Sequence, residues 1–201
     1  MSRAEIHKVA EADFPSRFGQ FRIFGFKLTA DGETEEAVAL KMGDLARGGP
    51  PLVRIHSQCL TGDVFHSLRC DCGAQLELAL ELIATEGRGA IIYENQEGRG
   101  IGLLNKLRAY ELQDQGADTV EANEQLGFEA DLRGYAMPAK ILRYFGLAAV
   151  RLISNNPEKI QALERAGVRV TERIPAIVAP VESSEDYLRT KRDKLGHLLG
   201  P

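Results

Sequence analysis

Strand-like and helix-like segments alternate along the chain once it has passed a Gly-Gly-Pro-Pro break at residues 48–51. Short apolar runs at residues 52–56, 90–93, 150–153 and 168–171 indicate strands. Between them, apolar residues recur at helical spacing, which indicates helices with one buried face. Strands that alternate with helices predict an α/β fold, here a layered mixed sheet flanked by helices.

The expected helices follow from apolar stripes and from terminal residues. Asn156 followed by Pro157 is a typical helix start, because Asn caps free N–H groups and Pro suits the first helical position. Ser183 and Asp186 resemble a capping box at the start of a C-terminal helix. The predicted helices contain the stripe Leu76, Leu80 and Ile83, then Leu103–Gln113, Ala139–Phe145, the segment after Asn156, and Ser183–Leu199.

Before the break, Gln20–Thr29 and Ala37–Met42 resemble two strands joined by a turn that contains Asp31-Gly32. This pattern predicts an N-terminal β-hairpin that leads into the main fold. We therefore expect a single domain over residues 1–201. It would comprise a lead-in at 1–50, a catalytic core at 51–180 and a C-terminal helix at 181–201.

Composition narrows the possible functions. The net charge of −4 argues against a general nucleic-acid binder, which is normally basic. No stretch approaches the roughly 20 apolar residues that a membrane-spanning helix needs, and the first residues lack the apolar core of a signal peptide. Three cysteines are an odd number, which is atypical of a secreted disulfide framework. We expect a cytoplasmic protein whose thiols stay reduced and can bind metal.

The cysteines form the clearest cluster of candidate ligands. Cys59, Cys70 and Cys72 lie within one short segment, and Gly73 eases a tight turn beside the Cys-x-Cys pair. Three buried inert thiols are the alternative, but clustering favours a metal site. Three protein ligands plus water are typical of catalytic zinc, whereas a fourth ligand, from His56 or His66, would indicate a structural site.

Two further loops join a predicted strand to a predicted helix. Residues 96–102 are rich in Gly and contain Glu97, which could accept from a purine N–H edge, and Arg99, which could hold phosphate. The second loop leads to Lys159 in a first helical turn, where the helix dipole disfavours a cation unless an anion binds. Taken alone, the first loop is as consistent with a turn that carries solvated charges, and for Lys159 simple solvation or a pair with Glu158 is the favoured interpretation. Asp131, Arg133 and Tyr110 are weaker candidates for proton transfer and charge stabilisation.

Together these segments resemble GTP cyclohydrolase II, the enzyme of the first step in riboflavin synthesis. The resemblance extends from about Pro51 to the C-terminus. It departs at Gln58, where the family often has Glu, and at Ser154, where it often has Thr. The matching segments are Arg54–Asp63, Arg69–Gly73, Gln96–Arg99, Gly102–Lys106, Gln113–Gly116, Asp118–Asn123, Leu126–Phe128 and Asn155–Pro157.

The resemblance implies specific roles for residues at matching positions. It places zinc on Cys59, Cys70 and Cys72. Asp131 matches the general base, Arg133 the residue described as the nucleophile, and Tyr110 a tyrosine that assists ring opening. The positions implied to contact the nucleotide are Arg54, Ile55, His56, Ser57, Gln58, Gln75, Glu97, Gly98, Arg99, Thr119, Ser154 and Lys159.

The implied reaction is zinc-dependent opening of the GTP imidazole ring at C8, with Mg²⁺ on the phosphates. Formate and pyrophosphate would leave, and the product would be a diaminopyrimidine ribosyl phosphate. The resemblance also implies a homodimer. The segment before Pro51 is too short for the second enzyme domain often found in the family, so one activity is expected. Two alternatives stay open: a reaction that stops before formate loss, and a zinc-stabilised nucleotide-binding module without catalysis.

Overall fold

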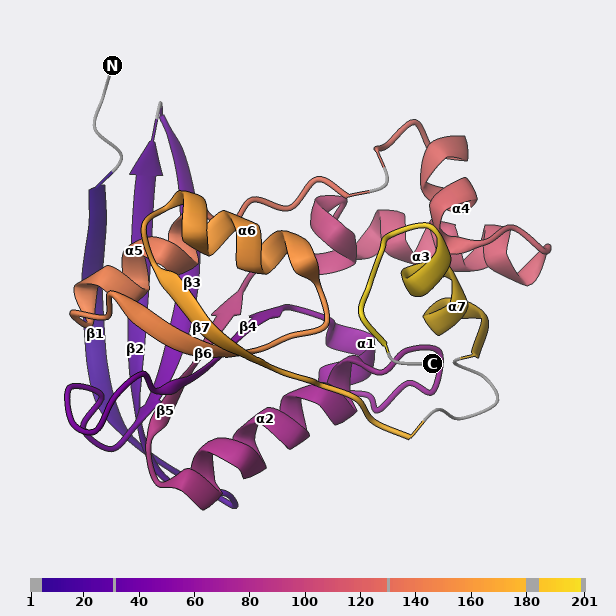
Figure 1. Cartoon of the computed structure of the whole chain (residues 1–201). Coiled ribbons are helices and arrows are strands. Elements are labelled where there is room, and N and C mark those ends of the chain that lie inside the picture. The colour runs from indigo at the N-terminus through magenta and orange to yellow at the C-terminus, as the bar shows by residue number, and fades with distance from the viewer. Residues whose placement is uncertain (1–4, 31, 130, 180–184, 200–201) are drawn as a thin grey trace.

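The computed structural model describes residues 5–30, 32–129, 131–179 and 185–199. Within this part of the chain the strands form one seven-stranded sheet in the order β1-β2-β3-β5-β4-β6-β7 (Figure 1). The predicted layered mixed sheet is therefore confirmed. The strands are β1 (Glu5–Ser16), β2 (Gly19–Ala30), β3 (Glu33–Met42), β4 (Leu52–Ser57), β5 (Gly89–Glu94), β6 (Ala149–Ile153) and β7 (Arg169–Ile174).

The N-terminal half of the sheet is antiparallel. The predicted hairpin is confirmed as β2 and β3, which pair antiparallel up to Ala30 and Glu33; Asp31 of the predicted turn lies outside the described residues. The sequence did not predict β1, which pairs antiparallel with β2 at the edge of the sheet. Most side chains of β1 are exposed, so it lacks the apolar alternation by which strands are found. The lead-in thus supplies three strands to the same sheet that carries the rest of the fold.

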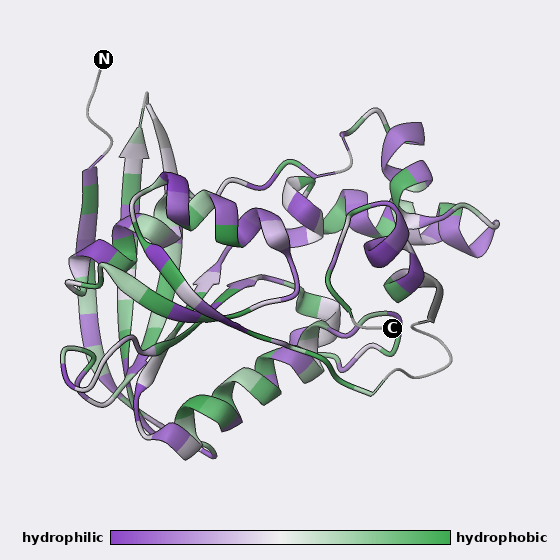
Figure 2. Cartoon of the chain, in the orientation of Figure 1, coloured by the Kyte–Doolittle hydropathy of each residue, from purple (hydrophilic) through white to green (hydrophobic). Residues whose placement is uncertain are grey.

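The other half of the sheet, from β5 through β4 and β6 to β7, is parallel. Helices cover both faces, which is typical of parallel sheets. On one face Ala79 and Ile83 of α2 (Cys72–Glu86) pack with Ile91 and Ile153. On the other face α5 (Ala136–Tyr144) and α6 (Pro157–Arg165) cover the strands. Figure 2 shows hydrophobic residues gathered on the strands and on α2.

The helices predicted over Leu103–Gln113, over Ala139–Phe145 and after Asn156 are confirmed with small shifts at their ends. Asn156 caps α6 by accepting from the Glu158 N–H at 2.9 Å, and Pro157 occupies the first turn, as predicted. The C-terminal helix α7 is shorter than predicted, and Ser183 lies outside the described residues. The remaining helices are α1 (Leu60–Asp63), the 3₁₀ turn η1 (Glu97–Gly100), α3 (Leu103–Asp114), α4 (Thr119–Gln125) and α7 (Glu185–Asp193).

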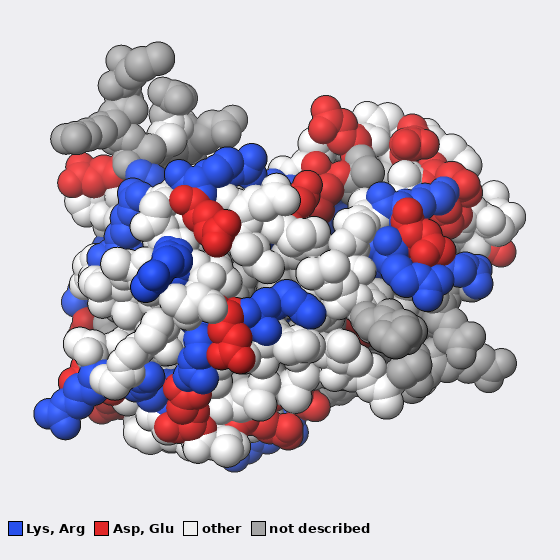
Figure 3. All heavy atoms as spheres, in the orientation of Figure 1, with Lys and Arg blue, Asp and Glu red and all other residues white. Residues whose placement is uncertain are grey.

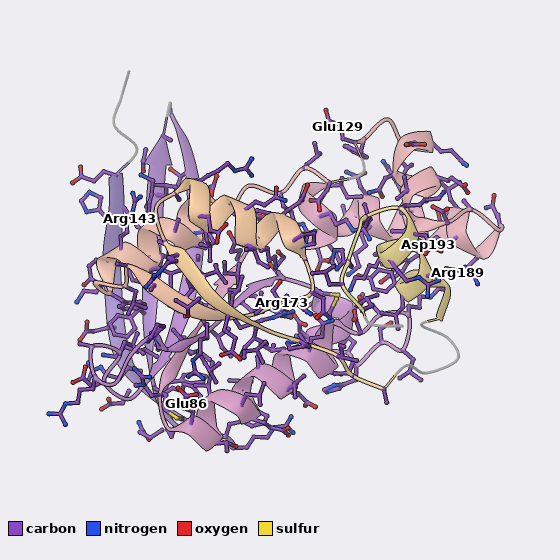
Figure 4. All side chains as sticks on the ribbon, in the orientation of Figure 1. Glu86, Glu129, Arg143, Arg173, Arg189 and Asp193 are labelled. Atoms are coloured by element: carbon purple, nitrogen blue, oxygen red, sulfur yellow. The ribbon has the colours of Figure 1, made fainter. Side chains whose placement is uncertain are left out.

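The arrangement brings distant segments to one edge of the sheet. Parallel strands end at the same edge, so the loops after β4, β5 and β6 meet there. Arg173 of β7, labelled in Figure 4, donates to the Ser154 carbonyl at 3.4 Å and ties β7 to this edge. Of the helices that the structure describes, none has the length and apolar character needed to span a membrane.

Candidate metal and nucleotide site

A cleft opens at the carboxyl ends of β4, β5 and β6. It encloses roughly 1070 Å³ of empty space, part of which is open to solvent. Among the described lining residues, seven are Lys or Arg and one, Glu97, is acidic. On the face seen in Figure 3, Lys and Arg are interspersed with Asp and Glu. Positive charge is therefore concentrated in the cleft, in contrast to the mixed charges on the face drawn in Figure 3.

Three cysteine sulfurs converge at this cleft. Cys59 ends the loop after β4, Cys72 opens α2, and Cys70 lies just before it. Their Sγ atoms lie within 4.8 Å of one another, and Cys59 and Cys70 are 3.7 Å apart. Hydrogen bonds from Cys70 and Cys72 lower the pKa of Cys59, with the Lys106 charge acting in the same direction. The predicted cysteine cluster is thus one compact set of soft ligands, which suits Zn²⁺.

Gly62 provides a test of this fit. A Cβ added at Gly62 would lie 3.0 Å from Cys70 Sγ, 3.1 Å from Cys72 Cβ and 3.2 Å from Cys59 Sγ. The three cysteines therefore close over a position where only a hydrogen fits. Gly73 is equally constrained, because its Cβ would lie 2.3 Å from the Gly62 carbonyl oxygen. The backbone thus holds the three sulfurs close together, in an arrangement that could bind a metal ion.

Histidine does not join this cluster within the described residues. The buried His56 ring contacts Asp63 instead, with Nε2 3.0 Å from Oδ1. Burial lowers the pKa of His56, although Asp63 opposes the shift, so the ring is neutral. The same carboxylate accepts from the Cys59 N–H at 3.0 Å and from the Tyr93 hydroxyl at 2.8 Å. His56 and Asp63 hold the segment of residues 59–73 that carries the three cysteines, here called the metal loop. The alternative of a fourth histidine ligand loses support.

Lys106 of α3 connects the cysteines to the loop after β5. Its ammonium group donates to Cys59 Sγ at 3.1 Å, Thr61 Oγ1 at 2.9 Å and Glu97 Oε1 at 2.8 Å. Thr61 in turn lies 3.2 Å from the Tyr110 hydroxyl. An ammonium has three N–H donors, so all of them are used by the protein. Lys106 lines the cleft as a positioning residue.

Glu97 is similarly occupied. One carboxylate oxygen accepts from Lys106 and from the Gly98 N–H at 2.9 Å, and the other accepts from the Leu60 N–H at 2.7 Å. Because a carboxylate has about four acceptor positions, little capacity is left for a purine edge. The geometry makes Glu97 a support for the metal loop more than a contact for the base.

Arg99 has the geometry of a ligand-binding residue. Its backbone lies in the left-handed region, with φ of 61°, next to Gly98 with φ of 62°. Such strain in a non-glycine residue persists where the surrounding structure enforces it, often at functional sites. Both terminal nitrogens of the guanidinium group are buried without a hydrogen-bond partner among the described residues. A buried, unpaired guanidinium calls for an anion.

Two more cations line the same wall. Arg54 donates to the Ile153 carbonyl at 3.1 Å and to Gln75 Oε1 at 2.7 Å. Lys159 donates to the Ile55 carbonyl at 2.8 Å. Burial and the charges of Arg133 and Arg54 hold the pKa of Lys159 well below its usual value. Bound anionic groups would relieve this crowding of positive charge.

Asp131 and Arg133 form a two-point ion pair. The Arg133 Nε–H donates to Asp131 Oδ1 at 2.8 Å, and a second nitrogen donates to Oδ2. Burial raises the pKa of Asp131, but hydrogen bonds and charge from Arg133 lower it by more. Conversely, burial lowers the pKa of Arg133, and Asp131 raises it by more. Arg133 lines the cleft as a fixed cation, and Asp131 lies behind it.

The cleft collects most of the residues that the sequence singled out. Ile55 is an exception, because its side chain packs in the core and only its carbonyl group, through Lys159, touches the site. Asp131 contributes through Arg133. The predicted residues that line the cleft are Arg54, His56, Ser57, Gln58, Cys59, Cys70, Cys72, Gln75, Glu97, Gly98, Arg99, Tyr110, Thr119, Arg133, Ser154 and Lys159.

Sequence reasoning missed several residues of the same cleft. Lys106 belonged to a recognised motif but had received no role. Tyr187, Lys191 and His197 come from the C-terminal segment, far from every motif. Asn123 of α4 also lines the wall. A cation in the predicted C-terminal helix resembles any solvated lysine, so no sequence signal marked Lys191.

Comparison with known proteins decides the family. The family model described as GTP cyclohydrolase II matches residues 7–175. The chain belongs to the GTP cyclohydrolase II family. The match starts well before Pro51, where the quoted motifs begin, so the N-terminal strands are part of the family fold. It ends before α7, so the cleft residues of the C-terminal segment lie outside the region that the family model matches.

Relatives of this GTP cyclohydrolase II family member support the assignment. GTP cyclohydrolase-2 from Azotobacter vinelandii is 56% identical over 96% of this chain and 91% of its own length. GTP cyclohydrolase-2 from Pseudomonas paraeruginosa is 57% identical over 96% of this chain and 93% of its own length. Riboflavin biosynthesis protein RibBA from Salinispora tropica is 55% identical to this chain. The match covers 98% of this chain and 49% of the length of RibBA.

A solved structure is also similar, though remotely. RibBX from A. baumannii, a two-domain 3,4-dihydroxy-2-butanone 4-phosphate synthase, has a TM-score of 0.48 and 17% identity. The similarity covers 87% of this chain and 40% of that one. Similarity this remote carries no functional information. Membership of the GTP cyclohydrolase II family confirms the resemblance and the hydrolase class, whereas zinc, magnesium, the homodimer and the cytoplasmic location stay predictions.

Proposed function

We propose that this chain hydrolyses GTP in riboflavin synthesis, opening the imidazole ring at C8 and releasing formate and pyrophosphate. The product would be the diaminopyrimidine ribosyl phosphate. The observation that carries the proposal is the position of the three cysteines within a cleft in which seven of the described lining residues are Lys or Arg. A soft-ligand metal site beside a polyanion site suits a hydrolase that acts on a nucleotide triphosphate.

The cations would bind the triphosphate. Arg99 has two unpaired terminal nitrogens among the described residues, and Lys159 holds its ammonium group in place through the Ile55 carbonyl. Phosphate oxygens would complete the hydrogen bonding of both groups. Mg²⁺ would be held by the nucleotide phosphates and not by the protein. Glu97, the acidic residue among the described lining residues, already accepts from the Leu60 N–H and pairs with Lys106. Ser57, Thr119 and Ser154 supply neutral donors and acceptors for the base and ribose.

Cys59, Cys70 and Cys72 would hold Zn²⁺ and leave one coordination position for a reactant. Bound zinc supplies a Lewis acid that makes water a nucleophile near neutral pH. Lys106 offsets part of the negative charge of the thiolates through its contact with Cys59. Tyr110 is protonated near neutral pH like any tyrosine, and burial raises its pKa further, so its hydroxyl group can donate to a nitrogen released by ring opening.

Arg133 would stabilise charge that develops at the phosphate. Its guanidinium stays protonated beside Asp131, and a protonated guanidinium is a poor nucleophile. We therefore favour an electrostatic role over a covalent one. Asp131 holds Arg133 in position, and action as a general base would require this ion pair to open.

The direct test is incubation of the protein with GTP and Mg²⁺, followed by assays of formate, pyrophosphate and the ultraviolet spectrum. The proposal expects all three to change. Pyrophosphate and a spectral change without formate would indicate a reaction that stops at the formamidopyrimidine, and no change would indicate a binding module. Cys70→Ser is expected to abolish formate release, while pyrophosphate release can survive. Formate production by a zinc-free Cys70→Ser protein would contradict the metal-based reaction.

A further inference from the structure

The C-terminal segment forms one wall of the cleft. Tyr187, Lys191 and His197 all line it, although they lie beyond the part of the chain that the family model matches. Figure 4 labels Arg189 and Asp193, which mark α7 beside α4. The backbone of the segment is anchored, because the Leu198 N–H donates to the Asn155 carbonyl at 2.8 Å.

Lys191 is the one cation that α7 presents to the cleft among the described residues. Its ammonium group donates to Asp71 Oδ1 at 2.6 Å and lies 4.4 Å from the centre of the Tyr187 ring. The side chain is 10% exposed. Asp71 lies between Cys70 and Cys72 and also accepts from the Gln75 amide at 2.5 Å. The contact therefore joins α7 to the metal loop.

The cleft that Lys191 faces is lined mainly by cations, although Asp71 and the Cys72 thiol lie close to its ammonium group. Burial, then the charges of Lys191, Arg133 and Arg99, lower the pKa of His197 to about 3, so this histidine adds no charge. Lys106 in the same cleft uses all three of its N–H donors in hydrogen bonds to protein atoms. For the Lys191 ammonium group, by contrast, the structure shows one hydrogen-bond acceptor among the described residues, the Asp71 carboxylate. An ammonium group with N–H donors to spare, at the wall of a cleft lined mainly by cations, is arranged for a polyanion.

We propose that Lys191 contacts the triphosphate of the bound substrate, and that residues 187–198 form a wall of the phosphate site. The proposal rests on GTP being the substrate. It assigns Lys191 a contact with phosphate oxygens through its free N–H groups while Asp71 holds the side chain in place. Tyr187 supports the ammonium group through its ring.

The test compares the zinc-loaded wild type with Lys191→Met, Lys191→Gln and Lys191→Arg. The probes are GTP, inorganic triphosphate and guanosine, measured by calorimetry, together with KM for GTP. Losing a charge-assisted hydrogen bond is expected to weaken binding roughly ten- to hundredfold. Both neutral variants should therefore lose that much affinity for GTP and triphosphate and keep their affinity for guanosine. Lys191→Arg should stay within a few-fold of wild type.

Arg192→Met is the matched control. Arg192 lies on the same helix, is exposed and pairs with its neighbour Asp193. Its loss removes the same charge and should leave binding and KM unchanged. Triphosphate affinity that is equal in wild type and both neutral variants would overturn the proposal, as would an equal loss for guanosine, which would mark a structural effect. Failure of the wild type to hydrolyse GTP would instead overturn the proposed function.

Discussion

Lys106 offers a sharp test of how the metal loop is held. Lys106→Met removes three hydrogen bonds and one member of an ion pair whose side chains are 11% and 7% exposed. Breaking a buried ion pair from one side costs about 3–5 kcal/mol, because the remaining charge is left uncompensated. Glu97 keeps its bonds to the Leu60 and Gly98 N–H groups. We therefore expect a loss of about 3 kcal/mol in the free energy of unfolding.

The assay is urea unfolding followed by circular dichroism, supported by thermal melting. For a chain of this size a loss of about 3 kcal/mol corresponds to roughly 6–12 °C in Tm. The double variant Lys106→Met with Glu97→Gln should recover part of the loss, since it removes both charges. The expected coupling energy is about 2 kcal/mol. Lys27→Met, an exposed lysine on β2, is the control and should change stability by less than about 0.5 kcal/mol.

A Lys106→Met protein as stable as the Lys27→Met control would refute this reasoning. Additive effects of the Lys106 and Glu97 substitutions would refute it as well, because the two side chains would then act independently. The turnover of the variant carries separate information. A lower kcat with an unchanged KM for GTP is expected, since Lys106 has no donor left for the substrate.

Two further predictions concern Gly62 and Glu94. Gly62→Ala should weaken zinc binding in chelator competition and lower stability by about 1–3 kcal/mol, because the new methyl group would crowd the cysteine sulfurs. Gly25→Ala, where an added Cβ meets no atom within 4 Å, is its control, and equal zinc affinity in the two variants would count against the crowding. Glu94 is buried, and this burial raises its pKa from 4.5 to about 8. Between those pH values the folded protein holds a proton that the unfolded chain releases, so wild-type stability should fall as pH rises, by up to about 1.4 kcal/mol per pH unit. Glu94→Gln should lack this component in urea unfolding at pH 5 to 8, and parallel pH profiles for the two proteins would contradict it.

Local features of this fold could be predicted from sequence. The apolar stripe of α2, the Asn156-Pro157 helix start and the spacing of the cysteines each depend on residues a few positions apart. Strand alternation could also have separated Ile55 from its neighbours. In β4, Arg54 and His56 line the cleft, whereas Ile55 points into the core.

Long-range features were beyond sequence reasoning. Strand β1 has mostly exposed side chains, and its place in the sheet follows from pairing with β2. The contact between Lys191 and Asp71 joins residues 120 positions apart. The ion pair of Asp131 with Arg133 resembles an ordinary surface pair in sequence, and only the fold buries it against the cleft. Each of these depends on tertiary packing, which local patterns do not encode.

Zinc content measured together with formate release tests the central claim most directly. Metal should be removed from the wild-type protein with a chelator and then restored stepwise, with formate and zinc quantified at each step. The account predicts that formate release is lost with the metal and returns in proportion to zinc, reaching a plateau at about one ion per chain. Undiminished formate release from zinc-free protein would contradict it.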